Sequence, residues 1–286
     1  MNDNDPEPVT PPSLSASTGV PIYQVDSFAT RAFAGNPAGV CLLDAPREDA
    51  WLQGVAVEMN VSETAFLVRN AQGYDLRWFT PAAEVDLCGH ATLAAAHVLW
   101  TEIGIEEPVL QFQTRSGILT AKQQSDGIEL DFPATPANST DIPAGLVDAL
   151  GINASDVAYC GRTPFDVLLE LRSVAQVRAI NPDFPRVAEC DARGVIVTAE
   201  GGPSDEATGI DFSSRFFAPR VGVDEDPVTG SAHCALAPFW AGKLNRQQLV
   251  GRQISARGGT VGVEVVQDRV LLRGQAITVM RGRFVA

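Results

Sequence analysis

Arg77-Trp-Phe-Thr-Pro81 leads to Gly89-His90-Ala91 and an alanine-rich stretch, and Arg215-Phe-Phe-Ala-Pro219 leads in the same way to Gly230-Ser231-Ala232 and a second one. This repetition indicates an internal duplication. In each copy a polar residue follows a glycine at the start of an apolar helix, where the first backbone N–H groups have no partner within the helix. Two such helix starts can face each other across one cleft, and we expect the function of the chain to lie there.

The duplication divides the chain into two halves. At 286 residues the chain could form one large domain or two of ordinary size, and the repeat favours two. We expect a first half at 21–133, which the last strand, 275–286, joins, and a second half at 137–274. Residues 1–20, rich in Pro, Ser, Asp and Asn, are predicted to be a disordered tail. The predicted class is α+β, with strands curled about a central helix in each half.

Composition argues against several classes of function. The sequence contains no apolar run long enough to span a bilayer, so we expect no membrane role. The net charge of -14 would repel nucleic acid, and no local basic patch offsets it. Residues 1–20 lack the cationic and apolar regions of a secretory signal, which makes the cytoplasm the expected compartment. The five cysteines are odd in number and form no CxxC pair, so we expect reduced thiols.

The apolar pattern predicts the elements that carry these motifs. An amphipathic helix is expected at 47–59 and a buried helix at 89–100, where apolar residues run nearly all round. A third helix is expected at 231–244, and Pro238 should end or kink it. Strands are expected at 22–25, 40–43, 65–68, 74–79, at three places within 109–132, and at 165–171, 194–198, 261–266, 270–272 and 276–280, with a turn at 33–37.

Candidate catalytic residues lie at one strand start and at the first helix start. Glu63 lies between Ser62 and Thr64 at the start of an apolar strand, where it is either a catalytic acid/base or a solvated turn carboxylate. His90 follows Cys88-Gly89 at a helix start, where N–H groups and the helix dipole favour anions and thiolates. A purely structural capping role is the alternative for His90.

The second helix start offers matching groups. Glu225-Asp226-Pro-Val-Thr229-Gly230-Ser231 brings carboxylates, hydroxyls and a glycine together, although Thr229 or Ser231 could simply cap the helix. Because similar strands precede both starts, we favour a shared function. No nucleotide, flavin, hydrolase or zinc motif occurs, so we expect chemistry without metal or organic cofactor, and His97 and His233 are expected to be packed polar residues.

Several motifs together closely resemble the PhzF family of phenazine biosynthesis-like isomerases, over nearly everything from about Pro21 onward. The matching segments are Val25-Asp26-x-Phe28, Phe33-x-Gly35-Asn36-Pro37, Asn60-x-Ser62-Glu63-Thr64-Ala65-Phe66, Arg77-Trp-Phe-Thr-Pro81-x-x-Glu84-Val-x-Leu-Cys-Gly89-His90-Ala91 and Glu225-Asp226-Pro-Val-Thr-Gly-Ser231-Ala232. The resemblance implies a diaminopimelate-epimerase-like fold of two pseudo-symmetric halves, each a curled, mostly antiparallel sheet around a central helix, and a homodimer.

The resemblance also implies an activity and residue roles. The named member of the family isomerises trans-2,3-dihydro-3-hydroxyanthranilate without metal or organic cofactor. For this chain it implies an isomerase that moves a proton between carbons of a small, carboxylate-bearing substrate. The family's catalytic glutamate, histidine, aspartate and serine fall on Glu63, His90, Asp226 and Ser231. The residues expected to bind the substrate are those at the two helix starts, Cys88, Gly89, Thr229 and Gly230.

Two other readings stay open. Related epimerases and racemases use two cysteines, one at each helix start, as opposed acid and base. Cys88 stands at the first such position, but we expect Val228 at the second, so the thiol pair is incomplete. The chain could be an amino acid epimerase or racemase that uses Cys88 with another base, or a catalytically silent relative that binds a small acid or a protein partner.

Overall fold

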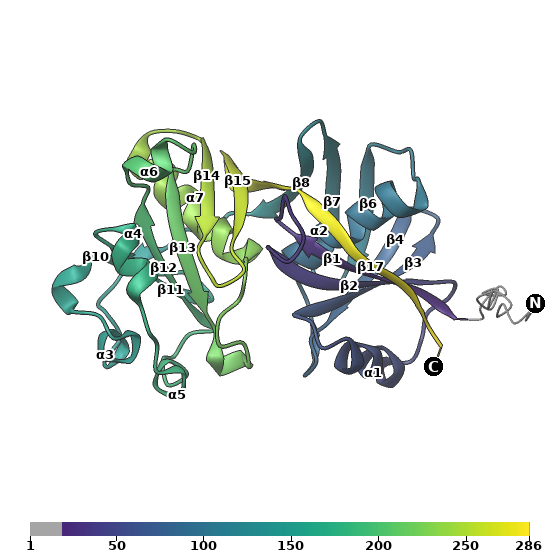
Figure 1. Cartoon of the computed structure of the whole chain (residues 1–286), viewed down its shortest axis with the longest axis horizontal. Coiled ribbons are helices and arrows are strands. Elements are labelled where there is room, and N and C mark those ends of the chain that lie inside the picture. The colour runs from purple at the N-terminus through teal and green to yellow at the C-terminus, as the bar shows by residue number, and fades with distance from the viewer. Residues whose placement is uncertain (1–18, 286) are drawn as a thin grey trace, which may run out of the picture.

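The computed structural model describes residues 19–285, except for the side chains of Pro203 and Glu206, and forms two lobes side by side (Figure 1). The expected tail at 1–20 therefore lies almost entirely outside the described residues, and its last residue, Val20, already begins a strand. None of the described helices is both long and apolar enough to cross a bilayer. All five cysteines are free thiols.

The first lobe wraps a sheet around one buried helix, α2 (Gly89–Val98), which continues into a π-helical turn at Leu99–Ile103. Helix α1 (Asp49–Met59) lies outside this sheet, below it in Figure 1. The strands are β1 (Val20–Ser27), β2 (Asn36–Leu43), β3 (Glu63–Asn70), β4 (Gly73–Phe79), β5 (Glu84–Val85), β6 (Val109–Thr114), β7 (Gly117–Gln124), β8 (Gly127–Pro133) and β17 (Ala276–Phe284). Because α2 presents alanine on every side and these alanines are fully buried, the strands can approach its backbone closely.

The second lobe repeats this plan around α7 (Gly230–Leu244). Its strands are β9 (Asn138–Ser139), β10 (Val157–Arg162), β11 (Asp166–Leu171), β12 (Gly194–Glu200), β13 (Phe212–Phe217), β14 (Gln248–Gln253), β15 (Gly259–Val266) and β16 (Arg269–Gly274). Its smaller helices are α3 (Leu146–Leu150), α4 (Val174–Ala179), α5 (Phe184–Val187) and α6 (Pro203–Glu206), with 3-10 turns at Ala154–Asp156 and Pro219–Val221. A separate apolar cluster packs α3, α4 and α5 against the outer face of β11 and β12.

Pro238 does not end α7, because the helix runs on to Leu244. Proline has no N–H, so it leaves the carbonyl four residues earlier without its helical partner. That carbonyl belongs to Cys234, and it accepts a hydrogen bond from the backbone N–H of Thr135 at 3.0 Å. A segment of the connection between the lobes thus replaces the bond that proline removes.

Strand pairing shows how the two lobes correspond and how they are joined. In each lobe a parallel pair, β2 with β3 or β11 with β12, is followed by an antiparallel neighbour, β4 or β13. The last strand, β17, pairs with β1, and β16 pairs with β8 across the two lobes. Most pairings are antiparallel. The α+β class and the diaminopimelate-epimerase-like arrangement expected from the sequence are therefore present.

Candidate active site

The two helix starts meet where the lobes join. A Cβ added to Gly89 would lie 3.5 Å from the Cα of Gly230, and one added to Gly230 would lie 3.4 Å from the Cα of Gly89. Glycine at both positions lets the two backbones approach this closely. Neither N-cap residue, Cys88 in α2 or Thr229 in α7, uses its side chain to cap its helix. The capping role considered for Thr229 is therefore absent, because its side chain bonds Asp226 instead.

The first lobe places Glu63 beside His90. Glu63 begins β3, His90 is the second residue of α2, and Glu63 Oε2 lies 3.0 Å from His90 Nε2. The two atoms are off the line of a hydrogen bond, and both are buried without any hydrogen-bond partner among residues 19–285. The Glu63 side chain keeps 18% exposure and that of His90 only 6%. Each group can therefore turn to a third atom without breaking an existing hydrogen bond.

Cys88 lies on the other side of the imidazole. Its Sγ is 3.6 Å from His90 Nδ1. Burial raises the pKa of the Cys88 thiol, so the thiol is neutral near pH 7. Burial lowers the pKa of His90, but its contacts with Cys88 and Glu63 raise it by more, to well above 6.5. Because the thiol stays protonated, we assign the support of a positive imidazolium mainly to the Glu63 carboxylate.

Asn36 connects the two lobes at this point, and sequence reasoning missed it. We expected a turn at 33–37, but Asn36 is the first residue of β2 and is fully buried. Its Nδ2 donates to Asp226 Oδ1 at 2.8 Å and to the Val228 carbonyl at 2.9 Å, and lies 3.2 Å from His90 Nδ1. Ser62 Oγ donates to its Oδ1 at 2.8 Å. The amide thus ties the first lobe to Asp226 and Val228 of the second and packs against the imidazole of His90.

Asp226 approaches His90 from the second lobe, with both of its oxygens already occupied. Oδ1 accepts from Asn36, and Oδ2 accepts from Thr229 Oγ1 at 2.5 Å. Burial raises the pKa of Asp226 to about 6, an effect that His90 opposes and Glu63 reinforces. The carboxyl group therefore changes charge near neutral pH.

Gln253, at the end of β14, supports this segment and was also missed. It is fully buried and its Oε1 accepts from the Thr229 N–H at 2.9 Å. Its Nε2 donates to the Asp226 carbonyl at 2.6 Å and to Thr229 Oγ1 at 3.2 Å. Gln253 lies in none of the sequence motifs, so only the fold brings it to the helix start.

Ser231 lies at the α7 start but makes no recorded contact with Glu63, His90 or Asp226 within residues 19–285. Its Oγ instead accepts a hydrogen bond from Arg193 Nη2 at 3.0 Å. Arg193, just before β12, is a third residue that sequence reasoning missed.

The position opposite Cys88 also needs a correction. Cys88 directly precedes Gly89 as the N-cap of α2, and Thr229 directly precedes Gly230 as the N-cap of α7. The residue equivalent to Cys88 is thus Thr229, and the expected Val228 is one position too early. The second helix start carries a hydroxyl there, so a pair of opposed thiols is absent from this junction.

One group of side chains in the described part of the chain could hold a metal ion. The donor atoms of Glu63, Cys88 and His90 lie within 4.8 Å of one another. However, the nitrogen of His90 that faces the thiol is Nδ1, and the nitrogen that faces the carboxylate is Nε2. The lone pairs of these two nitrogens diverge, so a single ion would require the side chains to rearrange.

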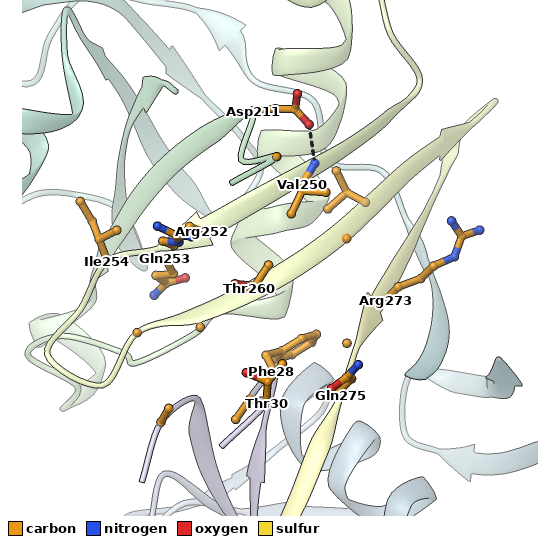
Figure 2. A pocket seen from close by; sticks show the side chains of 18 of the residues that line it. Phe28, Thr30, Asp211, Val250, Arg252, Gln253, Ile254, Thr260, Arg273 and Gln275 are labelled. Atoms are coloured by element: carbon orange, nitrogen blue, oxygen red, sulfur yellow. Dashed lines mark hydrogen bonds between the residues drawn. The ribbon is translucent and has the colours of Figure 1, made fainter. Parts of the chain in front are cut away.

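A groove of about 920 Å³ lies beside this junction and is lined in part by Gln253. Figure 2 shows it between β14 and β15 of the second lobe and Phe28 and Gln275 near the first. Glu63 and His90 do not line the groove. Gln253 does line it, on the far side of its contacts with Asp226 and Thr229. The candidate acid/base groups therefore lie outside this groove.

Comparisons with known proteins agree with this picture. A family model described as phenazine biosynthesis-like protein matches residues 25–282. An uncharacterized isomerase of Halalkalibacterium halodurans is 51% identical over 264 residues, covering 91% of this chain and 97% of the relative. The crystal structure of a phenazine biosynthesis protein, PhzF family, from Enterococcus faecalis has a TM-score of 0.88 at 39% identity, covering 94% and 100% of the two chains.

A more distant structure supports the fold alone. A predicted epimerase from Pseudomonas aeruginosa has a TM-score of 0.74 at 20% identity, covering 93% of this chain and 99% of that one. Taken together, the family match and the relatives support an isomerase- or epimerase-type function.

Proposed function

Since the chain belongs to the phenazine biosynthesis-like (PhzF) family, we propose that it moves a proton between carbons of a small, cyclic, carboxylate-bearing substrate where the two lobes join. One observation carries this proposal. Glu63 Oε2 and His90 Nε2 lie 3.0 Å apart, buried, and neither has a hydrogen-bond partner among residues 19–285. The two groups form a close ion pair whose geometry is poor for a hydrogen bond, so both buried atoms can still take a hydrogen-bond partner from a bound ligand.

Glu63 is the proposed base. Its carboxylate takes a proton from a substrate carbon, the C–H electron pair passes into the adjoining unsaturated system, and the same carboxyl returns the proton to another carbon. His90, with its raised pKa, carries positive charge beside this group and stabilises the negative charge that forms on the substrate. This sequence of steps requires neither a metal nor an organic cofactor.

The remaining site residues hold the substrate. At both helix starts the first N–H groups lack a side-chain cap, and the dipoles of α2 and α7 favour negative charge there. In the proposal the backbone N–H groups near Gly89 and Gly230 bind a carboxylate or an oxyanion. Asp226, with both oxygens held by Asn36 and Thr229, orients His90 and the substrate's polar groups. In the proposal the side chains of Ser231 and Cys88 lie beside these N–H groups and contact the bound substrate.

The racemase alternative loses support from two features. Burial raises the pKa of Cys88, which makes its thiolate scarce, and the equivalent residue at the other helix start is Thr229. An epimerase or racemase that uses Cys88 with another base needs a Cys88 thiolate and a second acid/base group facing it across the substrate. The single acid/base pair of Glu63 and His90 fits proton transfer by one residue better.

The test is proton NMR in D₂O with trans-2,3-dihydro-3-hydroxyanthranilate, followed by a panel of cyclic hydroxy acids and amino acids. Glu63→Gln should lower the rate of isomerisation and of deuterium incorporation by about 10²–10⁴-fold, the contribution of one positioned acid/base group. Glu58→Gln, an exposed glutamate on α1, is the matched control and should keep the wild-type rate.

The outcomes separate the readings. If Glu63→Gln keeps the wild-type rate, Glu63 is not the base. If the wild type neither converts any acid in the panel nor exchanges its protons, the isomerase proposal fails. Ligand-induced stabilisation without turnover would then favour a silent binding relative.

A further inference from the structure

Arg193 is held rigidly beside the α7 start. Its Nε and Nη2 donate to both oxygens of Asp166, at 2.9 and 2.5 Å, and the Asp166 side chain is only 3% exposed. Its guanidinium carbon lies 5.4 Å from the ring centre of Phe165 and 5.7 Å from that of Phe216. A buried carboxylate and two aromatic rings therefore fix the guanidinium in one orientation.

Arg193 still has hydrogen-bonding capacity toward the junction. Nη2 also donates to Ser231 Oγ at 3.0 Å, and Nη1 has no recorded hydrogen-bond partner among residues 19–285. The Arg193 side chain is 36% exposed although Asp166 beneath it is buried. Because the Ser231 oxygen accepts from Arg193, its own hydrogen remains available to donate. Arg193 Nη1 and the Ser231 hydroxyl are therefore two neighbouring donors that can bind one acceptor.

The register of the strands shows what Arg193 replaces. Arg77 of the first motif pairs with Phe66, and Arg215 of the second pairs with Val197. Counting back three or four residues along β3 and β12 makes Gly194 the counterpart of Glu63 and Arg193 the counterpart of Ser62.

The second lobe cannot carry a carboxylate at the position equivalent to Glu63. A Cβ on Gly194 would lie 2.4 Å from the Phe216 ring and 3.0 Å from the Phe217 carbonyl. Arg193 therefore supplies the charged side chain at this point of the second lobe. The duplicated framework presents an acid/base group at one helix start and a fixed cation at the other.

We propose that Arg193 is a specificity-determining residue that binds the carboxylate of the substrate at the α7 start. The carboxylate accepts from Nη1 of Arg193 and from the hydroxyl of Ser231, next to the uncapped N–H groups of α7. Its binding there leaves the reacting carbons toward Glu63 at the α2 start. The inference rests on the proposed function only for that last statement, since recognition of an anion by Arg193 is independent of turnover.

The test measures binding rather than catalysis. Isothermal titration compares 2-aminobenzoate with 2-aminobenzamide, its neutral counterpart. Charge-assisted hydrogen bonds to an anion should make the wild type prefer the acid by about 10- to 100-fold. The double variant Arg193→Gln/Asp166→Asn, which leaves no unpaired buried charge, should reduce this preference to about one. Arg193→Lys, which keeps the charge but loses the planar fork, should give an intermediate preference.

Two controls keep the inference falsifiable. Arg220→Gln removes an arginine of similar exposure that bonds the Cys190 carbonyl, and it should leave the preference unchanged. Thermal melting establishes that each variant is folded. The inference is overturned if the wild type binds neither compound, if it shows no preference for the acid, or if the folded double variant keeps the preference.

The same experiment distinguishes this inference from the proposed isomerase function. Glu63→Gln should bind 2-aminobenzoate with the wild-type preference although it no longer exchanges substrate protons. A wild type that binds 2-aminobenzoate through Arg193 but exchanges no substrate protons would refute the isomerase and keep the anion site. A wild type that exchanges substrate protons normally but binds 2-aminobenzoate independently of Arg193 would refute the anion site and keep the isomerase.

Discussion

His233 should make the protein lose stability in acid. It is fully buried in α7, and burial lowers its pKa to about 4. Its Nδ1 lies 2.8 Å from the Thr229 carbonyl, which can only accept, so Nδ1 carries the hydrogen and Nε2 does not. Nε2 is buried with no hydrogen-bond partner in the described part of the chain. Protonation of Nε2 would bury a positive charge that has no hydrogen-bond acceptor among residues 19–285.

The sign and size of the effect follow from the two pKa values. The unfolded chain binds this proton near pH 6.5 and the folded chain only near pH 4, so stability falls as the pH drops through this window. Between pH 8 and pH 5 the linkage relation gives a loss of about 2 kcal/mol from His233 alone. Asp226 acts in the opposite direction, because its raised folded pKa favours the folded state at low pH.

The variant His233→Asn isolates this contribution. Asparagine can still donate to the Thr229 carbonyl but does not titrate, and the small cavity it leaves costs the same free energy at every pH. Urea unfolding at pH 8 and pH 5 gives the free energy of unfolding of both proteins. The wild type should lose about 2 kcal/mol more than the variant, with the Asp226 contribution cancelling. Equal losses would refute the assignment of a neutral, unpaired imidazole.

Two further substitutions test the site and its framework. Asn36→Ala removes the amide that ties the first lobe to Asp226 and packs against His90, and should lower kcat by about 10²-fold in the proton NMR assay, as expected for misplaced reacting groups; an unchanged rate would exclude the positioning role. Gly194→Ala should lower the free energy of unfolding in urea by about 1–3 kcal/mol through overpacking against Phe216. Gly54→Ala, with open space around the added carbon in a helix, should not destabilise, and equal effects at both glycines would contradict this account.

Local pattern was enough to predict most of the fold. The repeated Arg77 and Arg215 motifs give the duplication, and burial of α2 follows from its alanines, because both are properties of neighbouring residues in the chain. The continuation of α7 past Pro238 depends instead on a contact between residues far apart in the chain. Helix α7 continues because the Thr135 N–H donates to the Cys234 carbonyl. Thr135 is far from Pro238 in the chain, so the sequence around Pro238 does not predict this bond.

The residues of the candidate site also fall into two groups, those in local sequence motifs and those that only the fold brings to the site. Glu63 at a strand start, His90 after a glycine and Asp226 within the second motif could be proposed from the sequence, because each lies in a recognisable local motif. Arg193 and Gln253 could not, because their contacts with Ser231 and Thr229 join residues far apart in the chain. Aligning the two halves by sequence does not expose Arg193 either. The connection from β12 to β13 includes α6 and is longer than that from β3 to β4, so only strand register equates Gly194 with Glu63.

The difference between the two lobes constrains the stereochemistry of the proposed reaction. A two-base epimerase removes the proton from one face of the carbon and delivers a proton to the other face, which inverts the centre. Here Gly194 stands where a second carboxylate would be, and both oxygens of Asp226 are occupied by Asn36 and Thr229. In the proposed mechanism Glu63 both removes and returns the proton, so the proton returns from the side on which it was taken. The chain should therefore shift a proton along one face of its substrate, which is isomerisation and not racemisation.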